Sequence, residues 1–189
     1  MQFFSKNVVF IRHGETEWNV QNRTQGHLNS PLTQQGISQA KEAAEKLKDY
    51  KFDIILSSHL GRAFETAKIV SEILNIPEII TDDCLSERNL GAMQGNTLAE
   101  SKKKFPYLWD CNGKFIYNAN IPNGESLENF LMRVGKAIEN LKKVSETKNI
   151  LVVTHDGVLS AMVSHLKNIE FSDVGKHYHF KNCDPVILS

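Results

Sequence analysis

The stretch Val8-Val9-Phe10-Ile11-Arg12-His13-Gly14-Glu15-Thr16 organises the rest of the chain. It opens with four apolar residues, mostly β-branched or aromatic, which is typical of a buried strand. Polar groups at the end of such a strand usually form a site: Arg12 offers a planar fork of donors suited to a phosphoryl group, and His13 can be a base, a nucleophile or a ligand. Gly14 would let the backbone come close to a bound group. The alternative is a strand end with a solvated arginine and histidine.

The composition is that of a soluble globular protein, and 189 residues suit a single domain over residues 1–189. Lys and Arg number 22, as do Asp and Glu, so the charge balance points to neither a nucleic acid nor a membrane as a partner. No signal peptide and no apolar run of transmembrane length is visible. Three widely spaced cysteines favour a reducing compartment, so we expect a cytoplasmic protein of undetermined oligomeric state: Cys84, Cys111 and Cys183.

The first half of the chain predicts strands that alternate with helices. After the first strand, we expect one helix capped by Thr33 and ending near Leu47, and a second over 61–74. Further strands are expected at 52–56 and 79–80. This β-α-β-α-β order is that of a parallel sheet with crossover helices.

The second half predicts an irregular insert followed by regular structure. Two glycines interrupt the stretch 85–95 within the irregular segment 82–123. This segment could be a lid over the site or a surface excursion with a solvated lysine face. A long helix then opens at 124–126, and 150–154 is an apolar, fully buried strand. A further helix follows from about Gly157, and 177–188 suggests one or two edge strands. The expected fold is α/β, a three-layer α/β/α sandwich with a mostly parallel central sheet and a lid-like insert.

Three of these strands end in polar residues, and parallel strands bring their carboxyl ends to one edge of the sheet. The resulting cleft would hold two arginines and two histidines, a positive pocket of the kind that a dianionic phosphoryl group requires. There is no P-loop and no serine nucleophile elbow, and the histidines lack zinc spacing, so we expect neither metal nor cofactor. The strand ends are Arg12-His13, Ser57-Ser58-His59 with Arg62 just beyond, and Thr154-His155.

The sequence resembles the histidine phosphatase superfamily, the phosphoglycerate mutase-like proteins, and more specifically its phosphatase branch. Six blocks occur in the expected order along nearly the whole chain, which makes chance a poor explanation. They are Arg12-His13-Gly14-Glu15-Thr16 with Trp18-Asn19; Gln25-Gly26 with Pro31-Leu32-Thr33 and Gly36; Ser57-Ser58 with Arg62-Ala63 and Thr66-Ala67; Leu85-Ser86-Glu87-Arg88 with Gly91 and Gln94-Gly95; Gly124-Glu125-Ser126 with Arg133-Val134; and Val153-Thr154-His155.

The resemblance implies catalytic roles. His13 would be the nucleophile that forms a phosphohistidine, and it must be neutral to attack. Arg12, Arg62 and His155 would bind the phosphoryl oxygens and disfavour the charged form of His13. Glu87 would protonate the leaving oxygen and then activate water. The substrate-binding set is completed by Gly14, Asn19, Gln25 and Gly26. The alternatives are a surface acid paired with Arg88 for Glu87, and a role in loop structure for Asn19 and Gln25.

The chain departs from the family pattern at Asp156, where a small residue usually follows the second histidine. We favour Asp156 as the N-cap of the next helix, because Asp is among the best capping residues. In the alternative, its carboxylate points into the pocket, repels the substrate phosphate and raises the pKa of His155.

The expected function is a metal-independent phosphatase acting on a small phosphorylated metabolite. A cofactor-dependent phosphoglycerate mutase is the alternative, in which a sugar-acid hydroxyl accepts the phosphoryl group in place of water. The block around Glu87 looks mutase-like, whereas the compact length and Gly124-Glu125-Ser126 look phosphatase-like. A non-catalytic, phospho-ligand-binding regulator is a third possibility, kept open by Asp156. The identity of the substrate is not given by the sequence.

Overall fold

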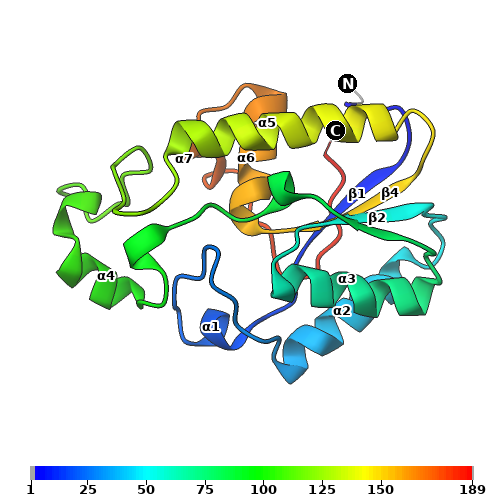
Figure 1. The fold of residues 1–189 in the computed structure, drawn as a ribbon, viewed down its shortest axis with the longest axis horizontal. Coiled ribbons are helices and arrows are strands. Elements are labelled where there is room, and N and C mark those ends of the chain that lie inside the picture. The colour runs from blue at the N-terminus through cyan, green and yellow to red at the C-terminus, as the bar shows by residue number, and fades with distance from the viewer. Residues whose placement is uncertain (1–2, 189) are drawn as a thin grey trace.

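The computed structural model describes residues 3–188 and is built around a four-stranded sheet (Figure 1). Its strands are β1 (Val8–Arg12), β2 (Ile54–Ser57), β3 (Ile79–Thr81) and β4 (Ile150–Thr154). They are all parallel and lie in the order β1-β4-β2-β3. Val152 of β4 is therefore the neighbour of Phe10 on one side and of Leu56 on the other.

Helices cover both faces of the sheet, which confirms the expected three-layer architecture. In Figure 1, α5 and α6 lie on one side of the strands and α2 and α3 on the other. No helix within residues 3–188 is both long and apolar enough to cross a membrane. The helices are α1 (Glu17–Val20), α2 (Gln34–Leu47), α3 (Gly61–Leu74), α4 (Leu98–Lys104), α5 (Leu127–Val144), α6 (Asp156–Lys167) and α7 (Phe171–Val174).

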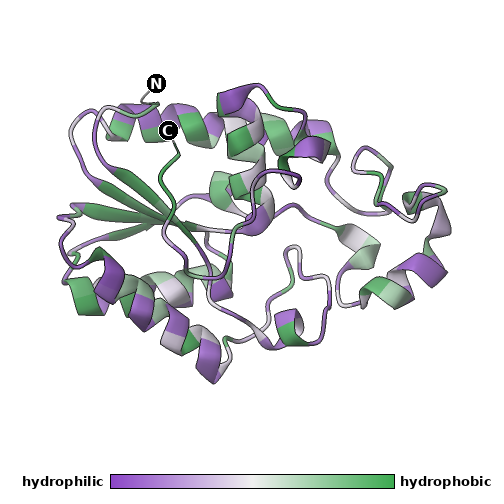
Figure 2. Ribbon diagram, turned by 180° about the vertical axis from the view of Figure 1, so that it is seen from behind, coloured by the Kyte–Doolittle hydropathy of each residue, from purple (hydrophilic) through white to green (hydrophobic). Residues whose placement is uncertain are grey.

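The two hydrophobic cores follow from the alternation of side chains along the strands. Phe10 and Val152 belong to the core under α5 and α6, whereas Ile11 and Val153 belong to the core under α2 and α3. Because both faces are covered, the central strands are apolar at nearly every position. Figure 2 shows this pattern as hydrophobic strands between helices whose outer faces are hydrophilic.

Most of the predicted elements are confirmed. Thr33 caps α2 by accepting a hydrogen bond from the Gly36 amide at 2.9 Å, and Ser126 caps α5 in the same way. The bounds of α3 are those expected. The short helix α1 was not predicted, although Thr16 and Asn19 form a capping box at its start.

The prediction of edge strands in 177–188 is wrong. The tail makes only isolated bridges with β1, between Val186 and Phe10 and between Asn182 and Arg12. Cys183 lies between these two contacts with a left-handed φ of 54°. This conformation turns the chain and interrupts any extended run.

The segment 82–123 is less irregular than its sequence suggests. It contains α4 and short 3-10 turns at 83–85, 91–93 and 106–108. A small separate core forms inside it from Met93, Leu108 and Ile121. The segment therefore has internal packing of its own, beyond the two cores that flank the sheet.

Candidate active site

The carboxyl ends of β1 and β4 bring two histidines together. His13 follows β1 and His155 follows β4, the strand beside it. The centroids of their rings are 5.2 Å apart, with an angle of 57° between the planes. Both side chains are buried. The structure thus places the two predicted histidines at one edge of the sheet.

The hydrogen bonds of His13 define its tautomer. Its Nδ1 lies 2.8 Å from the carbonyl oxygen of Gly14, which can only accept, so Nδ1 carries the proton. The lone pair is therefore on Nε2, where it accepts a 3.3 Å hydrogen bond from Nε of Arg62. Burial, and after it the charges of Arg62 and Arg12, hold the pKa of His13 well below its ordinary value. The ring is neutral and presents a nucleophilic nitrogen.

Arg62 is fixed in position by the loop that follows α1. It lies in the first turn of α3 and is 1% exposed. Its Nη1 donates to the carbonyl of Leu28 at 3.0 Å and its Nη2 to that of Gly26 at 2.8 Å. Burial lowers its pKa to about 10, which leaves the guanidinium charged at neutral pH. The positive charge beside His13 therefore has little freedom to move.

Three buried polar atoms near this histidine pair have no hydrogen-bond partner within residues 3–188: Nε of Arg12, Nδ1 of His155 and Oε1 of Gln25. Arg12 is held by its Nη1, which donates to the carbonyl of Phe180 at 3.0 Å. Burial is the main cause that lowers the pKa of His155 well below its ordinary value, followed by Arg62. An unpaired buried polar atom costs about 1–3 kcal/mol, so such atoms point to a site where a polar ligand is bound.

Glu87 is held by two backbone amides. Its carboxylate accepts from Arg88 N at 2.8 Å and from Gly157 N, in the first turn of α6, at 3.2 Å. A Cβ atom on residue 157 would lie 2.2 Å from Oε1 of Glu87, so this close approach requires glycine. Burial raises the pKa of Glu87, Arg62 opposes the rise and Asp156 adds to it. The site therefore favours the protonated form of this carboxyl group more than water does.

The prediction that Asp156 caps α6 is wrong by one residue. His155 occupies the cap position with extended backbone angles, and Asp156 is the first helical residue. The strand ends at Thr154 as predicted, and the helix begins one residue earlier than a cap at Asp156 requires. The exposed carboxylate instead lines two cavities, one of about 260 Å³ shared with Glu87 and one of about 270 Å³ shared with Arg12. The alternative is therefore right about the position of the carboxylate at the edge of a cavity. Its expected rise in the pKa of His155 is wrong, because burial and then Arg62 lower that pKa and Asp156 is not among the causes.

Two of the predicted binding residues have local structural roles. The amide oxygen of Asn19 accepts from the backbone and hydroxyl of Thr16, which caps α1. The amide of Gly14 donates to the Thr66 hydroxyl at 3.0 Å, and a Cβ at residue 14 would meet the Gly36 carbonyl oxygen at 2.6 Å. Backbone packing alone thus accounts for a glycine at position 14, and its contact with a substrate stays a prediction.

Several residues that sequence reasoning did not assign to the site contact its members. The Ser58 hydroxyl lies 2.8 Å from Nε2 of His155. A chain of contacts continues from Ser58 to Ser86 at 3.4 Å, from Ser86 to Nδ1 of His59 at 3.2 Å, and from His59 to Asp83 at 2.7 Å. Ser58 lies in one of the blocks that resemble the family, so the sequence gives some indication that it is near the site. Nothing in the sequence predicts the chain of contacts that runs from Ser58 to the surface through His59.

His27 and Asn182 were also not assigned to the site. His27 Nε2 donates to the carbonyl of Glu87 at 2.7 Å. The Asn182 side-chain amide donates to the carbonyl of His13 at 2.7 Å, and the amide of Cys183 donates to that of Arg12 at 2.9 Å. The C-terminal tail therefore fixes the backbone at the end of β1.

The block Gly124-Glu125-Ser126 with Arg133 supports Glu87. Arg133 donates to the carbonyls of Ser86 at 2.8 Å and Glu87 at 3.2 Å. The Glu125 carboxylate pairs with the same guanidinium at 2.8 Å. This arrangement holds the loop that carries Glu87. Within residues 3–188, no group of three or more His, Cys, Asp or Glu side chains could hold a metal ion.

Comparison with known proteins agrees with this geometry. The family model described as histidine phosphatase superfamily (branch 1) matches residues 8–189. The chain is 38% identical over 157 residues to phosphoglycerate mutase-like protein 4 of Arabidopsis thaliana, covering 82% of this chain and 68% of that protein. It is 35% identical over 171 residues to a metal-independent phosphoserine phosphatase of the same plant, covering 89% and 71%. The α-ribazole phosphatase of Shigella flexneri superposes with a TM-score of 0.82 and 31% identity, covering 94% of this chain and 87% of that one. The protein belongs to the histidine phosphatase superfamily.

Proposed function

We propose that this protein is a metal-independent phosphatase that hydrolyses a small phosphorylated metabolite through a phosphohistidine at His13. The observation that carries the proposal is the unprotonated Nε2 of His13, whose lone pair accepts a 3.3 Å hydrogen bond from the guanidinium of Arg62. Arg12 and His155 add buried polar atoms without partners within residues 3–188. These groups suit a phosphoryl group, since arginine matches phosphate oxygens in both charge and geometry.

In the first step, Nε2 of His13 attacks phosphorus and the bond from phosphorus to the ester oxygen breaks. The proton of the Glu87 carboxyl passes to the leaving oxygen, so an alcohol departs and Glu87 becomes a carboxylate. Arg12, Arg62 and His155 stabilise the negative charge on the three phosphoryl oxygens.

In the second step, the Glu87 carboxylate takes a proton from a water molecule as its oxygen attacks phosphorus. The bond from phosphorus to nitrogen breaks, inorganic phosphate leaves, and His13 returns to its neutral form. Glu87 is protonated again and ready for the next cycle. The raised pKa of Glu87 and the lowered pKa of His13 are the directions that these roles require.

The relatives do not fix the leaving group. Their names include a phosphoserine phosphatase, an α-ribazole phosphatase and a phosphoglycerate mutase-like protein. Part of the segment 82–123 lines the cavity beside Glu87, so this lid-like insert would cover the site and set specificity. The cysteines are all free thiols, which suits the expected cytoplasmic location.

The test is release of inorganic phosphate from a panel of phosphate monoesters, with and without EDTA. We expect release that EDTA does not change. In a parallel reaction, 3-phosphoglycerate is supplied with a trace of 2,3-bisphosphoglycerate. Isomerisation faster than phosphate release would establish the mutase alternative, and binding of phosphate esters without turnover would establish a non-catalytic regulator.

A further inference from the structure

Five aromatic rings form a continuous chain beside Glu87. Successive ring centroids are 5.6, 5.3, 5.1 and 6.1 Å apart, and the rings meet edge to face. The rings line a single cavity of about 260 Å³ and belong, in order, to Trp109, Phe115, Tyr117, Phe171 and Phe130. They come from three separate parts of the chain, so the fold assembles this surface.

The position of this inner cavity relates it to the reaction. Glu87 and Gly157 line it together with the rings. Under the proposed function, the Glu87 carboxyl delivers its proton to the leaving oxygen. The carbon skeleton attached to that oxygen must then extend from Glu87 into the space that Glu87 lines.

The charges at the inner cavity disfavour an acidic leaving group. The Asp156 carboxylate is exposed at the cavity, and Glu87 becomes negative once it has released its proton. Arg88 also lines the cavity and balances one of these two negative charges, so one negative charge remains once Glu87 is ionised. Its Nε and Nη1 donate to the carbonyls of Glu125 at 2.9 Å and Tyr117 at 2.7 Å, whereas its buried Nη2 has no hydrogen-bond partner within residues 3–188 and can donate to a neutral acceptor of the ligand. Leu98 of α4 is 54% exposed although it lines the same space, as expected for a side chain that meets an apolar ligand.

We propose that the substrate is the phosphate monoester of an uncharged, ring-bearing alcohol whose ring occupies the inner cavity, and that Tyr117 limits its length. This rests on the proposed function. Aromatic walls bind flat apolar groups by burying their surface and by edge-to-face contact.

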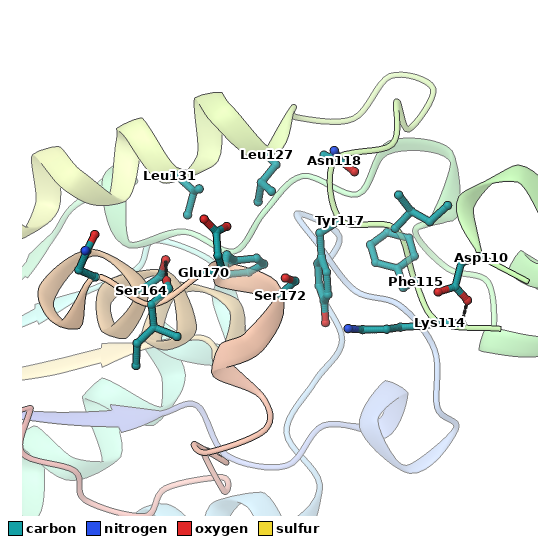
Figure 3. Close-up of a pocket in the computed structure, with 14 residues that line it drawn as sticks. Asp110, Lys114, Phe115, Tyr117, Asn118, Leu127, Leu131, Ser164, Glu170 and Ser172 are labelled. Carbon is teal, nitrogen blue, oxygen red and sulfur yellow. Dashed lines mark hydrogen bonds between the residues drawn. The ribbon is translucent and has the colours of Figure 1, made fainter. Parts of the chain in front are cut away.

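The rings limit the length of the substrate because they separate the inner cavity from a second one. This outer cavity, of about 760 Å³, shares Phe115, Tyr117 and Phe171 with the inner one. Figure 3 shows Phe115 and Tyr117 projecting from the 110–118 loop at its side. The Tyr117 and Phe171 rings meet at 90°, with centroids 5.1 Å apart, and separate the two spaces. Removing the Tyr117 ring would join the cavities.

The test compares kcat/KM for four esters of primary alcohols: benzyl phosphate, 4-carboxybenzyl phosphate, biphenyl-4-ylmethyl phosphate and glycerol 1-phosphate. We expect benzyl phosphate to exceed both glycerol 1-phosphate and the carboxylate ester by at least about tenfold. Tyr117→Ala should raise the ratio of the biphenyl ester to benzyl phosphate by about tenfold. Tyr107→Ala is the matched control, because Tyr107 lies in the same segment, is 55% exposed and lines neither cavity.

Binding provides a readout that does not need turnover. Benzylphosphonate should bind at least about tenfold more tightly than methylphosphonate in calorimetry. Equal rates for glycerol 1-phosphate and benzyl phosphate, or equal binding of the two phosphonates, would overturn the inference while leaving a phosphatase. An unchanged ester ratio in Tyr117→Ala would overturn the assigned limit on length. Absence of phosphate release from every ester, with the phosphonates still bound, would instead overturn the proposed function.

Discussion

Nε of Arg62 donates a hydrogen bond to Nε2 of His13 across 3.3 Å. The proposed nucleophile is thus already in contact with the guanidinium that would stabilise the negative charge of the transition state. Arg62 reaches this position because its other two nitrogens donate to the carbonyls of Leu28 and Gly26. The loop after α1 therefore orients the guanidinium.

Arg62→Lys should abolish this arrangement while keeping the charge. A lysine has one nitrogen and cannot serve His13, Leu28 and Gly26 together. We expect kcat/KM to fall by about 10²–10³-fold, the cost of losing one preorganised donor to the developing charge. Steady-state kinetics on benzyl phosphate measure this, with Arg23→Lys, a partly exposed arginine paired with Glu100, as the control. A loss of less than threefold, with a correctly folded variant, would remove Arg62 from the mechanism.

Glu87→Gln should act through the leaving group. An amide cannot donate the proton that an alkoxide needs, so benzyl phosphate should slow by about 10²–10⁴-fold. p-Nitrophenyl phosphate should slow much less, because its phenolate leaves without protonation. Rates for the two esters with wild type and variant provide the measurement. An equal loss on both would assign Glu87 to binding alone.

Asp156→Asn should shift the pH profile. The Asp156 charge helps to raise the pKa of Glu87, so its removal lowers that pKa. Glu87 must be protonated to act, and activity is lost as pH rises through its pKa. The alkaline limb of kcat/KM should therefore move to lower pH in the variant. Asp49→Asn, on an exposed residue just past the end of α2, should leave the limb in place. If the alkaline limb of kcat/KM stayed in place or moved to higher pH in Asp156→Asn, Asp156 would not raise the pKa of the catalytic acid.

The sequence carried most of the information about the sheet and its polar edge. Apolar runs such as 150–154 predict buried strands, and alternation with helices predicts parallel pairing, so His13 and His155 could be expected to meet. The prediction for Asp156 was wrong because its high N-cap propensity suggested that α6 begins one residue later than it does. His155 is the N-cap residue, and Asp156 is the first residue of the helix. Propensity is a weak guide to element ends.

Other parts of the site could not be predicted. Asn182 contacts the carbonyl of His13 across 169 residues of sequence, and no local pattern reports such a contact. Ser58 lies in a recognised block, but its bond to His155 depends on how β2 and β4 pair. Tyr117 lies in an irregular loop and Phe171 in a short helix, and their rings meet in the folded protein. Neither element has the hydrophobic periodicity that would have predicted this contact from the sequence.

Asn182→Ala tests the support from the C-terminal tail. The variant leaves the His13 carbonyl without its side-chain donor, which should cost about 1 kcal/mol in the free energy of unfolding. Because the same bond positions the nucleophile, kcat should fall by about tenfold. Asn140→Ala, on the exposed face of α5, is the matched control. Loss of stability with unchanged kcat would make Asn182 structural only.

Stability should fall below neutral pH. The pKa values of His13 and His155 are lowered in the folded state, so below about pH 6.5 the unfolded chain binds protons that the folded protein does not. Their contribution is present above that value and is lost as pH falls. Each should cost about 1 kcal/mol between about pH 7.5 and pH 5.5. Urea unfolding at both pH values measures this, and His13→Asn should show a smaller loss. Equal losses in the two proteins would mean that His13 titrates in the folded state as it does when unfolded.

The most direct test of the central claim is to trap the phosphorylated protein. Wild type, mixed briefly with benzyl phosphate and quenched without acid, should carry one acid-labile phosphoryl group on Nε2 of His13, located by mass spectrometry and by the ³¹P shift. Nε2 is expected because Nδ1 is engaged by the carbonyl of Gly14. His13→Ala should carry none and should not turn over. A phosphoryl group on another residue, or turnover of His13→Ala at the wild-type rate, would contradict the account.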